Sequence, residues 1–357
     1  MKKKNFLMIC ILSFVIVALS GPISKSTAST AQEVIKLKFS TYLVADHPVA
    51  VAAQQFCAEI KKRTNGRVEI LFYPNGTVLS ATKTYQGVAS GIADIGMSNI
   101  SYTRGRFPVM ELLDLPMGFS SAHVATKVDN EFYNKFKPKD FDNVHLLYLH
   151  GCSPYVIFTT KKPVRTLEDL RGMKIGGKGR IADTLKTLGA VPVPVEAADY
   201  YESLQRGIVE GMALPSNLLK DWKLGEVVKY STNVQSLGSV YTFYVVFNLE
   251  KWNNLPSDIK KIIDEVSSEW QEKTATAWSG AANDGIAFLL TRGGQTIDLS
   301  VQESAKWQKA ASPIITSYVK EMEAAGHKRT DIEGYLKFVR ERINYWSNKD
   351  RDVGPSK

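Results

Sequence analysis

The segments YQGVASGIADIGM, Tyr85–Met97, and YESLQRGIVEGM, Tyr201–Met212, follow one pattern. In each segment a Gly-Ile pair lies six residues after the tyrosine, and an acidic residue lies three positions after that glycine. A strand-like run opens upstream of each copy, at residues 65–68 and 188–191. The recurrence predicts two similar α/β lobes in one chain, and two lobes make a cleft between them.

The residues around the first copy alternate between strand and helix patterns. Ile35–Phe39 alternates as a strand, residues 49–64 carry an apolar helical face, and residues 68–72 alternate again before the turn at Tyr73–Gly76. The repeated segment then predicts a helix that runs into a short strand, Ile92–Met97. This order favours a mostly parallel sheet covered by helices.

The second copy has a similar neighbourhood. Strand patterns occur at residues 156–159, 173–175 and 191–195, and helical patterns begin at the capping box Thr166–Asp169 and at Ile181. Tyr241–Phe247 is an apolar strand that we expect to cross back between the lobes. The fold class predicted is therefore α/β, with two lobes around a cleft.

A helical pattern without proline runs from Ser257 to about Leu290, roughly 50 Å at 1.5 Å per residue. A helix of that length exceeds one lobe, so we expect it to brace both, and two further helices follow at about 301–325 and 330–347. The domains predicted are a signal peptide (1–31), a first lobe (32–154, with about 245–275 returning to it) and a second lobe (155–244, with about 276–357 packing across both).

The first residues are typical of a secretory signal peptide, because Lys2–Lys4 precedes a short apolar run and a small-residue stretch. We therefore expect export to the periplasm through a cleavable leader. An uncleaved N-terminal anchor is the alternative.

The net charge of the remaining chain is moderate. Removal of residues 1–31 leaves 41 basic and 36 acidic side chains, a net charge of +5 that is dispersed along the chain. This charge disfavours nucleic-acid binding and mildly favours a small anion.

Cysteine and histidine usage predicts no metal site. Cys10 lies in the leader, which leaves Cys57 and Cys152, either as a disulfide or as buried thiols. The five histidines have no ligand spacing. Motifs of serine hydrolases, zinc peptidases and P-loop enzymes are absent from the sequence, so we predict no enzyme and no cofactor.

The turn Gly177-x-Gly179-x-x-Ala182 has two interpretations. It satisfies a relaxed dinucleotide fingerprint, with Glu196 about 20 residues on, which would suit an exported NAD-dependent oxidoreductase. Alternatively, the free N–H groups of a helix N-terminus, together with Lys178 and Arg180, would bind a carboxylate or phosphate. The same two side chains could also be solvated loop charges.

An ordered series of segments resembles the solute-binding proteins of tripartite ATP-independent periplasmic (TRAP) transporters, solute-binding protein family 7, which includes the C4-dicarboxylate-binding proteins. The resemblance covers most of the chain to about residue 290. The matching segments are FSTY at Phe39–Tyr42 with His47-Pro48, RTNGR at Arg63–Arg67, YPN at Tyr73–Asn75, GIAD at Gly91–Asp94, GRFP at Gly105–Pro108, Leu115-Pro116, TLEDLRGMKI at Thr166–Ile175, LGA at Leu188–Ala190, LQRGIVEG at Leu204–Gly211 and WNNLP at Trp252–Pro256.

The resemblance implies a periplasmic-binding-protein-like fold, in which two α/β lobes close on a small organic acid and deliver it to a membrane permease. The chain differs from the family at one position. The family usually has an arginine that binds the ligand carboxylate directly after the Lys-Ile strand, and this chain has Gly176 there. We expect Arg180, with Lys178, to take that role, unless the ligand is not gripped as a simple carboxylate. Asn217 is our substitute for a family asparagine that is displaced here.

We therefore predict an extracytoplasmic receptor for a small organic anion, monomeric, whose partners are the permease subunits of a TRAP transporter. A sensor that presents its ligand to a receptor kinase is a further alternative. Trp222, Trp252, Trp270 and Trp278 are interpreted as structural, and core packing is the alternative for every aromatic in the predicted site. Because loops after strands face the cleft in open α/β sheets, the predicted ligand-binding residues are Tyr42, His47, Asn75, Ser98, Tyr102, Tyr155, Lys178, Arg180, Asn217 and Tyr241.

Overall fold

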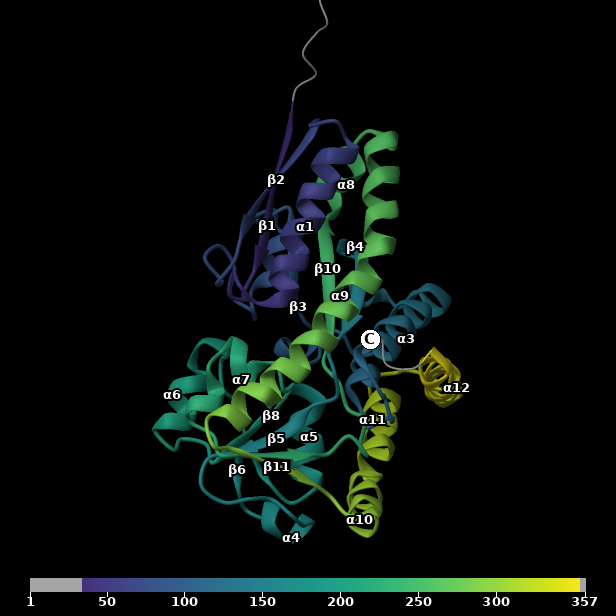
Figure 1. Ribbon diagram of the computed structural model, residues 1–357. Coiled ribbons are helices and arrows are strands. Elements are labelled where there is room, and N and C mark those ends of the chain that lie inside the picture. The colour runs from purple at the N-terminus through teal and green to yellow at the C-terminus, as the bar shows by residue number, and fades with distance from the viewer. Residues whose placement is uncertain (1–33, 354–357) are drawn as a thin grey trace, which may run out of the picture. The chain divides into compact units, whose positions relative to one another are not determined.

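A computed structural model describes residues 34–353, and the predicted signal peptide lies outside the described residues. Two β-sheets organise this part of the chain (Figure 1). The first has the order β2-β1-β3-β10-β4 and the second the order β11-β9-β5-β8-β6-β7. We call the parts built on the first and second sheets lobe I and lobe II. The prediction of two α/β lobes is confirmed.

Lobe I combines a parallel half with an antiparallel half. β1 lies parallel to β2 and β3, whereas β10 runs antiparallel to β3 and β4. Its strands and helices are β1 Ile35–Thr41, α1 Pro48–Arg63, β2 Val68–Tyr73, α2 Thr84–Ala89, β3 Ile95–Asn99, α3 Ala122–Phe136, β4 Val144–Gly151, β10 Thr242–Asn248 and α8 Leu249–Asn254.

Lobe II has a parallel edge, β8-β6-β7, joined through antiparallel β5 to β9 and β11. Its strands and helices are β5 Val156–Thr159, α4 Leu167–Leu170, β6 Lys174–Gly176, α5 Gly179–Thr187, β7 Val191–Val193, α6 Tyr200–Gln205, β8 Gly211–Leu214, α7 Leu218–Asp221, β9 Tyr230–Asn233 and β11 Gln295–Asp298.

The chain crosses between the sheets at residues 152–155 and again at 234–241. The two crossing segments pair with each other, since Cys152 N–H donates to Tyr241 O (3.1 Å) and Tyr155 N–H donates to Ser239 O (3.1 Å). Asp114 accepts the Thr242 N–H (2.8 Å) where the second segment enters lobe I. The crossings therefore form a two-stranded hinge anchored by a buried carboxylate.

The long helix α9, Ser257–Thr291, packs on α1, α3 and β4 of lobe I and on α7 of lobe II (Figure 1). Its Trp270 Nε1–H donates to Ala52 O (2.6 Å) and its Trp278 Nε1–H donates to His150 Nδ1 (2.9 Å). The predicted bracing helix is confirmed, because an apolar stripe with helical spacing reaches the cores of both lobes.

The C-terminal helices differ from the sequence prediction. The helix expected over 301–325 is divided into α10, Val301–Ala311, and α11, Pro313–Ala324. Pro313 has no N–H and its ring obstructs the carbonyl one turn earlier, so it begins a new helix. The last helix, α12, spans Arg329–Val353 and packs on α3.

The repeated segments have the same local structure in both lobes. Asp94 accepts the N–H of Lys38 on β1 (2.7 Å), and Glu210 accepts the N–H of Lys174 on β6 (3.0 Å). The backbone N–H groups of both acidic residues donate to the carbonyls of the same two lysines. Each acidic residue thus fixes the turn before a strand to its parallel neighbour, which makes the repeat a scaffold element.

Candidate functional site

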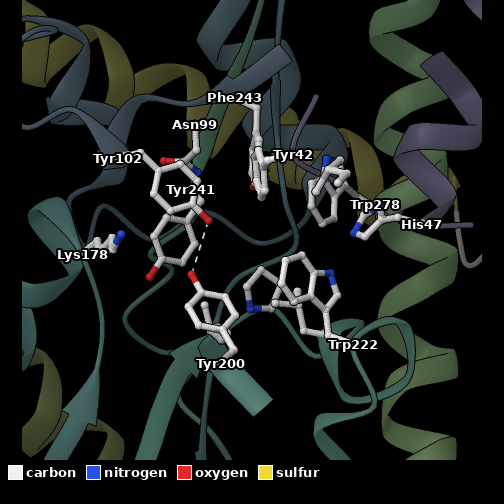
Figure 2. A pocket seen from close by; sticks show the side chains of 14 residues that line it. Tyr42, His47, Asn99, Tyr102, Lys178, Tyr200, Trp222, Tyr241, Phe243 and Trp278 are labelled. Atoms are coloured by element: carbon white, nitrogen blue, oxygen red, sulfur yellow. Dashed lines mark hydrogen bonds between the residues drawn. The ribbon is translucent and has the colours of Figure 1, made fainter. Parts of the chain in front are cut away.

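A cavity of about 460 Å³, including space open to solvent at its mouth, lies between the lobes and is drawn in Figure 2. Side chains of both lobes and of α9 form its walls. The lining residues are Tyr42, Leu43, His47, Asn99, Tyr102, Lys178, Tyr200, Leu214, Pro215, Leu218, Trp222, Tyr241, Phe243 and Trp278.

Several of the lining residues lie at the ends of strands. Tyr42 follows β1, Asn99 ends β3, Lys178 follows β6 and Leu214 ends β8. In open α/β sheets the carboxyl ends of the strands face the ligand crevice. The two repeated turns lie at the opposite ends of β3 and β8, so they direct Asn99 and Leu214 into the cavity from opposite lobes.

The lobes touch across the cavity through side chains. Tyr102 Oη of lobe I lies 3.3 Å from Tyr200 Oη of lobe II, and His47 Nε2 of lobe I lies 3.1 Å from Asn217 Nδ2 of lobe II. Neither contact could survive a separation of the lobes. The structure therefore represents a closed arrangement.

His47 is a neutral member of the wall. It precedes α1, and its Nδ1 accepts the N–H of Val49 (3.1 Å), so the ring caps the helix. Burial lowers the pKa of His47 to about 3, because the charged imidazolium would lose its hydration. The edge of the ring meets Trp278 at a centroid distance of 5.2 Å.

Lys178 is the one lysine or arginine among the lining residues of the described chain. Its Nζ lies 2.7 Å from Glu196 Oε1 and 5.0 Å from the centre of the Tyr102 ring. The Lys178 side chain is 12% exposed, whereas that of Glu196 is 54% exposed. An ammonium has three donors, so one carboxylate leaves donors for a second partner in the cavity.

The remaining polar groups of the wall are uncharged. Burial raises the pKa of Tyr42, Tyr102, Tyr200 and Tyr241 well above the ordinary value, so their hydroxyls stay protonated. Tyr241 Oη donates to Ala213 O (3.0 Å) and thereby ties the hinge to β8. The described residues of the cavity wall consequently offer neutral hydrogen-bonding groups and a single positive charge, at Lys178.

Asp221 stands behind the wall, where it accepts a hydrogen bond from Asn217 Nδ2 (2.9 Å) and lies 3.7 Å from His47 Nε2. Burial raises the pKa of Asp221 to about 6. Asn217 thus connects α7 of lobe II with the residue that caps α1 of lobe I.

Five predicted residues line the cavity and five lie elsewhere. Tyr42, His47, Tyr102, Lys178 and Tyr241 form part of the wall. Asn217 lies directly behind His47 and is fully buried. Tyr155 is buried in the hinge, and Ser98 Oγ donates to Ala81 O (2.8 Å) inside lobe I.

Asn75 is exposed in a turn with φ of 60°. A left-handed backbone suits asparagine. Its N–H donates to Leu43 O (2.8 Å), so it supports the cavity wall through the backbone.

Arg180 lies outside the cavity wall, in a buried charge cluster. Its Nε lies 2.9 Å from Glu111 Oε2 of lobe I and its Nη1 lies 2.6 Å from Glu321 Oε2 of α11. Its guanidinium covers the Tyr318 ring at 5.0 Å. This arrangement gives Arg180 a structural place between lobe I, lobe II and α11. At Gly176, a Cβ would stand 2.9 Å from Met212 Cγ, so Met212 fills the space beside this position.

The wall also contains polar and aromatic residues that were not predicted from the sequence, among them Asn99, Tyr200 and Phe243. The sequence held a signal for each of them. Asn99 lies two residues after the predicted strand that ends at Met97, Tyr200 directly precedes the second repeated segment, and Phe243 lies near the start of the strand predicted from Tyr241. Trp222 and Trp278, interpreted as structural, line the cavity as well, whereas Trp252 and Trp270 are buried in the core of the first lobe.

Within residues 34–353, no three His, Cys, Asp or Glu side chains are grouped to hold a metal ion. Cys57 and Cys152 are buried free thiols. No helix in the same part of the chain is long and apolar enough to span a membrane.

Two α/β lobes, a two-strand hinge, a bracing helix and a cavity between the lobes define a periplasmic-binding-protein-like solute receptor. The family profile described as bacterial extracellular solute-binding protein, family 7, matches residues 39–321, and the chain belongs to this family.

Curated relatives span most of the chain. The chain is 24% identical to the C4-dicarboxylate-binding periplasmic protein DctP of Rhodobacter capsulatus, over 79% of this chain and 86% of that protein. It is 25% identical to the 2,3-diketo-L-gulonate-binding periplasmic protein YiaO of Escherichia coli, over 70% and 76%.

Solved structures show the same fold. A TRAP periplasmic solute-binding protein of Desulfovibrio salexigens, in an open complex, is 29% identical with a TM-score of 0.74, covering 86% of this chain and 95% of that one. A TRAP solute-binding protein of Rhodoferax ferrireducens, in complex with copurified benzoate, is 23% identical with a TM-score of 0.83, covering 88% and 99%. The predicted resemblance to TRAP solute-binding proteins is confirmed.

Proposed function

We propose that the protein is an exported receptor that binds a small organic carboxylate between its lobes and delivers it to the permease subunits of a TRAP transporter. One observation carries the proposal: among its described lining residues, the cavity shared by both lobes has a single cation, Lys178, beside neutral polar and apolar side chains. An ammonium on a side chain that is only 12% exposed favours an anion, and a ligand that touches both lobes stabilises the closed form.

The ligands of the relatives support this class of solute. The relatives above bind C4-dicarboxylates, 2,3-diketo-L-gulonate and benzoate. A protein of Bordetella bronchiseptica with a TM-score of 0.80 holds mandelate. A carboxylate is common to all of these molecules, whereas the rest of the structure varies.

The dinucleotide alternative meets a steric obstacle. Gly179 begins α5 with φ of 54°, and a Cβ at this position would stand 2.6 Å from Ser101 Oγ of lobe I. Lobe I therefore covers the helix terminus that would receive a pyrophosphate. The lining residues within 34–353 include one lysine and no nucleophile paired with a base, which also favours binding without chemistry.

A thermal-shift panel tests the proposal. The chain without its leader is heated with single organic acids, with NAD and with buffer alone, because a ligand of the folded state raises the melting temperature. We expect at least one carboxylate to stabilise the protein and NAD to have no effect. Stabilisation by NAD alone would overturn the proposal, and so would a panel without any stabilising carboxylate.

A pair of lysine variants locates the charge. Lys178→Met should abolish the carboxylate-dependent shift, whereas Lys186→Met, an exposed residue later in α5, should preserve it. An unchanged shift in Lys178→Met would show that Lys178 does not bind the carboxylate.

Delivery to the permease is tested separately. Uptake of the stabilising acid is measured in vesicles that contain the cognate permease, with and without the receptor, and we expect uptake only when the receptor is present.

A further inference from the structure

We propose that the ligand is a flat, ring-containing monocarboxylate that places its carboxylate at Lys178 and an oxygen substituent, at the other end of the ring, against the indole N–H of Trp222. This inference rests on the proposed function and narrows its ligand class. It assigns each end of the cavity to a different part of one molecule.

The cavity has two chemically different ends, as Figure 2 shows. Lys178, Tyr102 and Asn99 lie at one end, and His47, Trp222 and Trp278 lie at the other. Leu43, Leu214, Pro215 and Leu218 complete the apolar part of the wall. An occupant that satisfies both ends is charged at one end and apolar along its body.

The charge count limits the ligand to one carboxylate. Lys178 is the single formal cation among the described lining residues, and His47 is neutral at physiological pH because burial lowers its pKa to about 3. A second carboxylate would lie against tryptophan and leucine side chains, where an unpaired charge loses its hydration without compensation. Dicarboxylates therefore fit this wall poorly.

The aromatic side chains favour a flat ring over a sugar or a chain. Phe243 and Trp278 pack at a centroid distance of 5.0 Å, and Tyr200 and Trp222 at 5.6 Å, so two aromatic pairs flank the space. Aromatic rings gain from offset or edge-to-face contacts beyond simple burial. A sugar acid would need a hydrogen-bonding partner for each hydroxyl, and this end of the cavity supplies few.

Trp222 provides the second anchor. Its Nε1 is buried and finds no acceptor among the described residues, although a buried indole N–H normally has a partner. By contrast, the N–H of Trp278 in the same wall already donates to His150 Nδ1 (2.9 Å). The Trp222 N–H is therefore an unpaired donor within a residue of the wall. A ligand oxygen that displaces the atoms packed over this N–H would satisfy it, so an oxygen substituent should increase affinity.

Calorimetric titration with matched acids tests the inference. The probes are benzoate, 3- and 4-hydroxybenzoate, and 3- and 4-methylbenzoate, which have nearly the size of the hydroxy acids but no oxygen. Cyclohexanecarboxylate, succinate and glucuronate are compared on the same protein. We expect at least one hydroxybenzoate to bind about tenfold more tightly than its methyl partner, the value of one net hydrogen bond.

Two tryptophan variants separate the donor from the ring. Trp222→Phe keeps an aromatic ring without the N–H, and should reduce the preference for hydroxyl over methyl to about twofold or less. Trp278→Phe should weaken the ring acids together but leave that preference intact, because its N–H is already used by His150. Folding of each variant is checked by its urea transition.

The outcomes distinguish the inference from the proposed function. Tighter binding of succinate, glucuronate or cyclohexanecarboxylate than of every aromatic acid would overturn the inference and leave the carboxylate receptor standing. Equal binding of hydroxy and methyl acids, or a hydroxyl preference that persists in Trp222→Phe, would overturn the oxygen subsite. Binding of no carboxylate at all would overturn the proposed function itself.

Discussion

Gly285 is the point at which the bracing helix meets the cavity wall. A Cβ at this position would stand 1.9 Å from Ser216 O and 2.8 Å from Asn217 Cα. Ser216 Oγ also donates to Ala282 O of α9 (3.0 Å). Replacing Gly285 with alanine would therefore force α9 and the segment between β8 and α7 apart.

Two opposing effects set the size of the change. Alanine is favoured over glycine inside a helix by about 1 kcal/mol. Overpacking costs about 1–3 kcal/mol, and the upper end applies here because both contacting groups are backbone and neither can rotate away. We expect Gly285→Ala to lower the free energy of unfolding by about 1–2 kcal/mol and to weaken ligand binding, since Pro215 and Leu218 of the displaced segment line the cavity.

Gly280 supplies a matched control in the same helix, because a Cβ there would meet no atom within 4 Å. Gly280→Ala should raise the free energy of unfolding by up to about 1 kcal/mol. Urea unfolding followed by far-UV circular dichroism measures both variants. If Gly285→Ala proved as stabilising as Gly280→Ala, the close approach of α9 to Ser216 would be refuted.

Three further changes follow from buried or paired charges. Arg180→Met should lower the free energy of unfolding by roughly 3 kcal/mol, because the buried Glu111, 3% exposed, loses its charge partner. Ligand affinity should persist in this variant. A folded variant that no longer binds the ligand would show that Arg180 belongs to the binding site. Burial raises the pKa of Asp114 to about 7, well above its value in an unfolded chain. The folded state therefore binds this proton more tightly than the unfolded state does. The contribution of Asp114 to the free energy of unfolding consequently falls as the pH rises from about 4 to about 7. Asp114→Asn should remove this pH-dependent loss of stability, which is up to about 4 kcal/mol for the wild type at pH 8. Urea unfolding at pH 5 and pH 8 measures it. An equal change in the free energy of unfolding between the two pH values in both proteins would contradict the prediction. Glu196→Gln should raise carboxylate affinity roughly two- to fivefold, because an exposed acid no longer competes for Lys178; weaker binding by calorimetry would instead show that Glu196 positions the ammonium.

Local patterns in the sequence were sufficient for the architecture. The paired segments at Tyr85–Met97 and Tyr201–Met212 predicted two similar lobes, and the uninterrupted pattern from Ser257 predicted the helix that joins them. Such features depend on side-chain periodicity within one element. The helix predicted over 301–325 was wrong where a single residue, Pro313, overrode the pattern.

The sequence by itself thus determined the lobes, the bracing helix and the strand ends at which a site could form. It placed the crossing at Tyr241–Phe247, whereas that strand lies within the sheet of lobe I and residues 234–241 before it make the crossing. Only the tertiary structure decided which side chains face the cavity. Arg180 is held by Glu321, 141 residues away, and Trp278 enters the wall from a helix that packs on both lobes. The physical reason is that strand and helix patterns are local, whereas the direction and charge partners of a side chain depend on elements brought together only by folding.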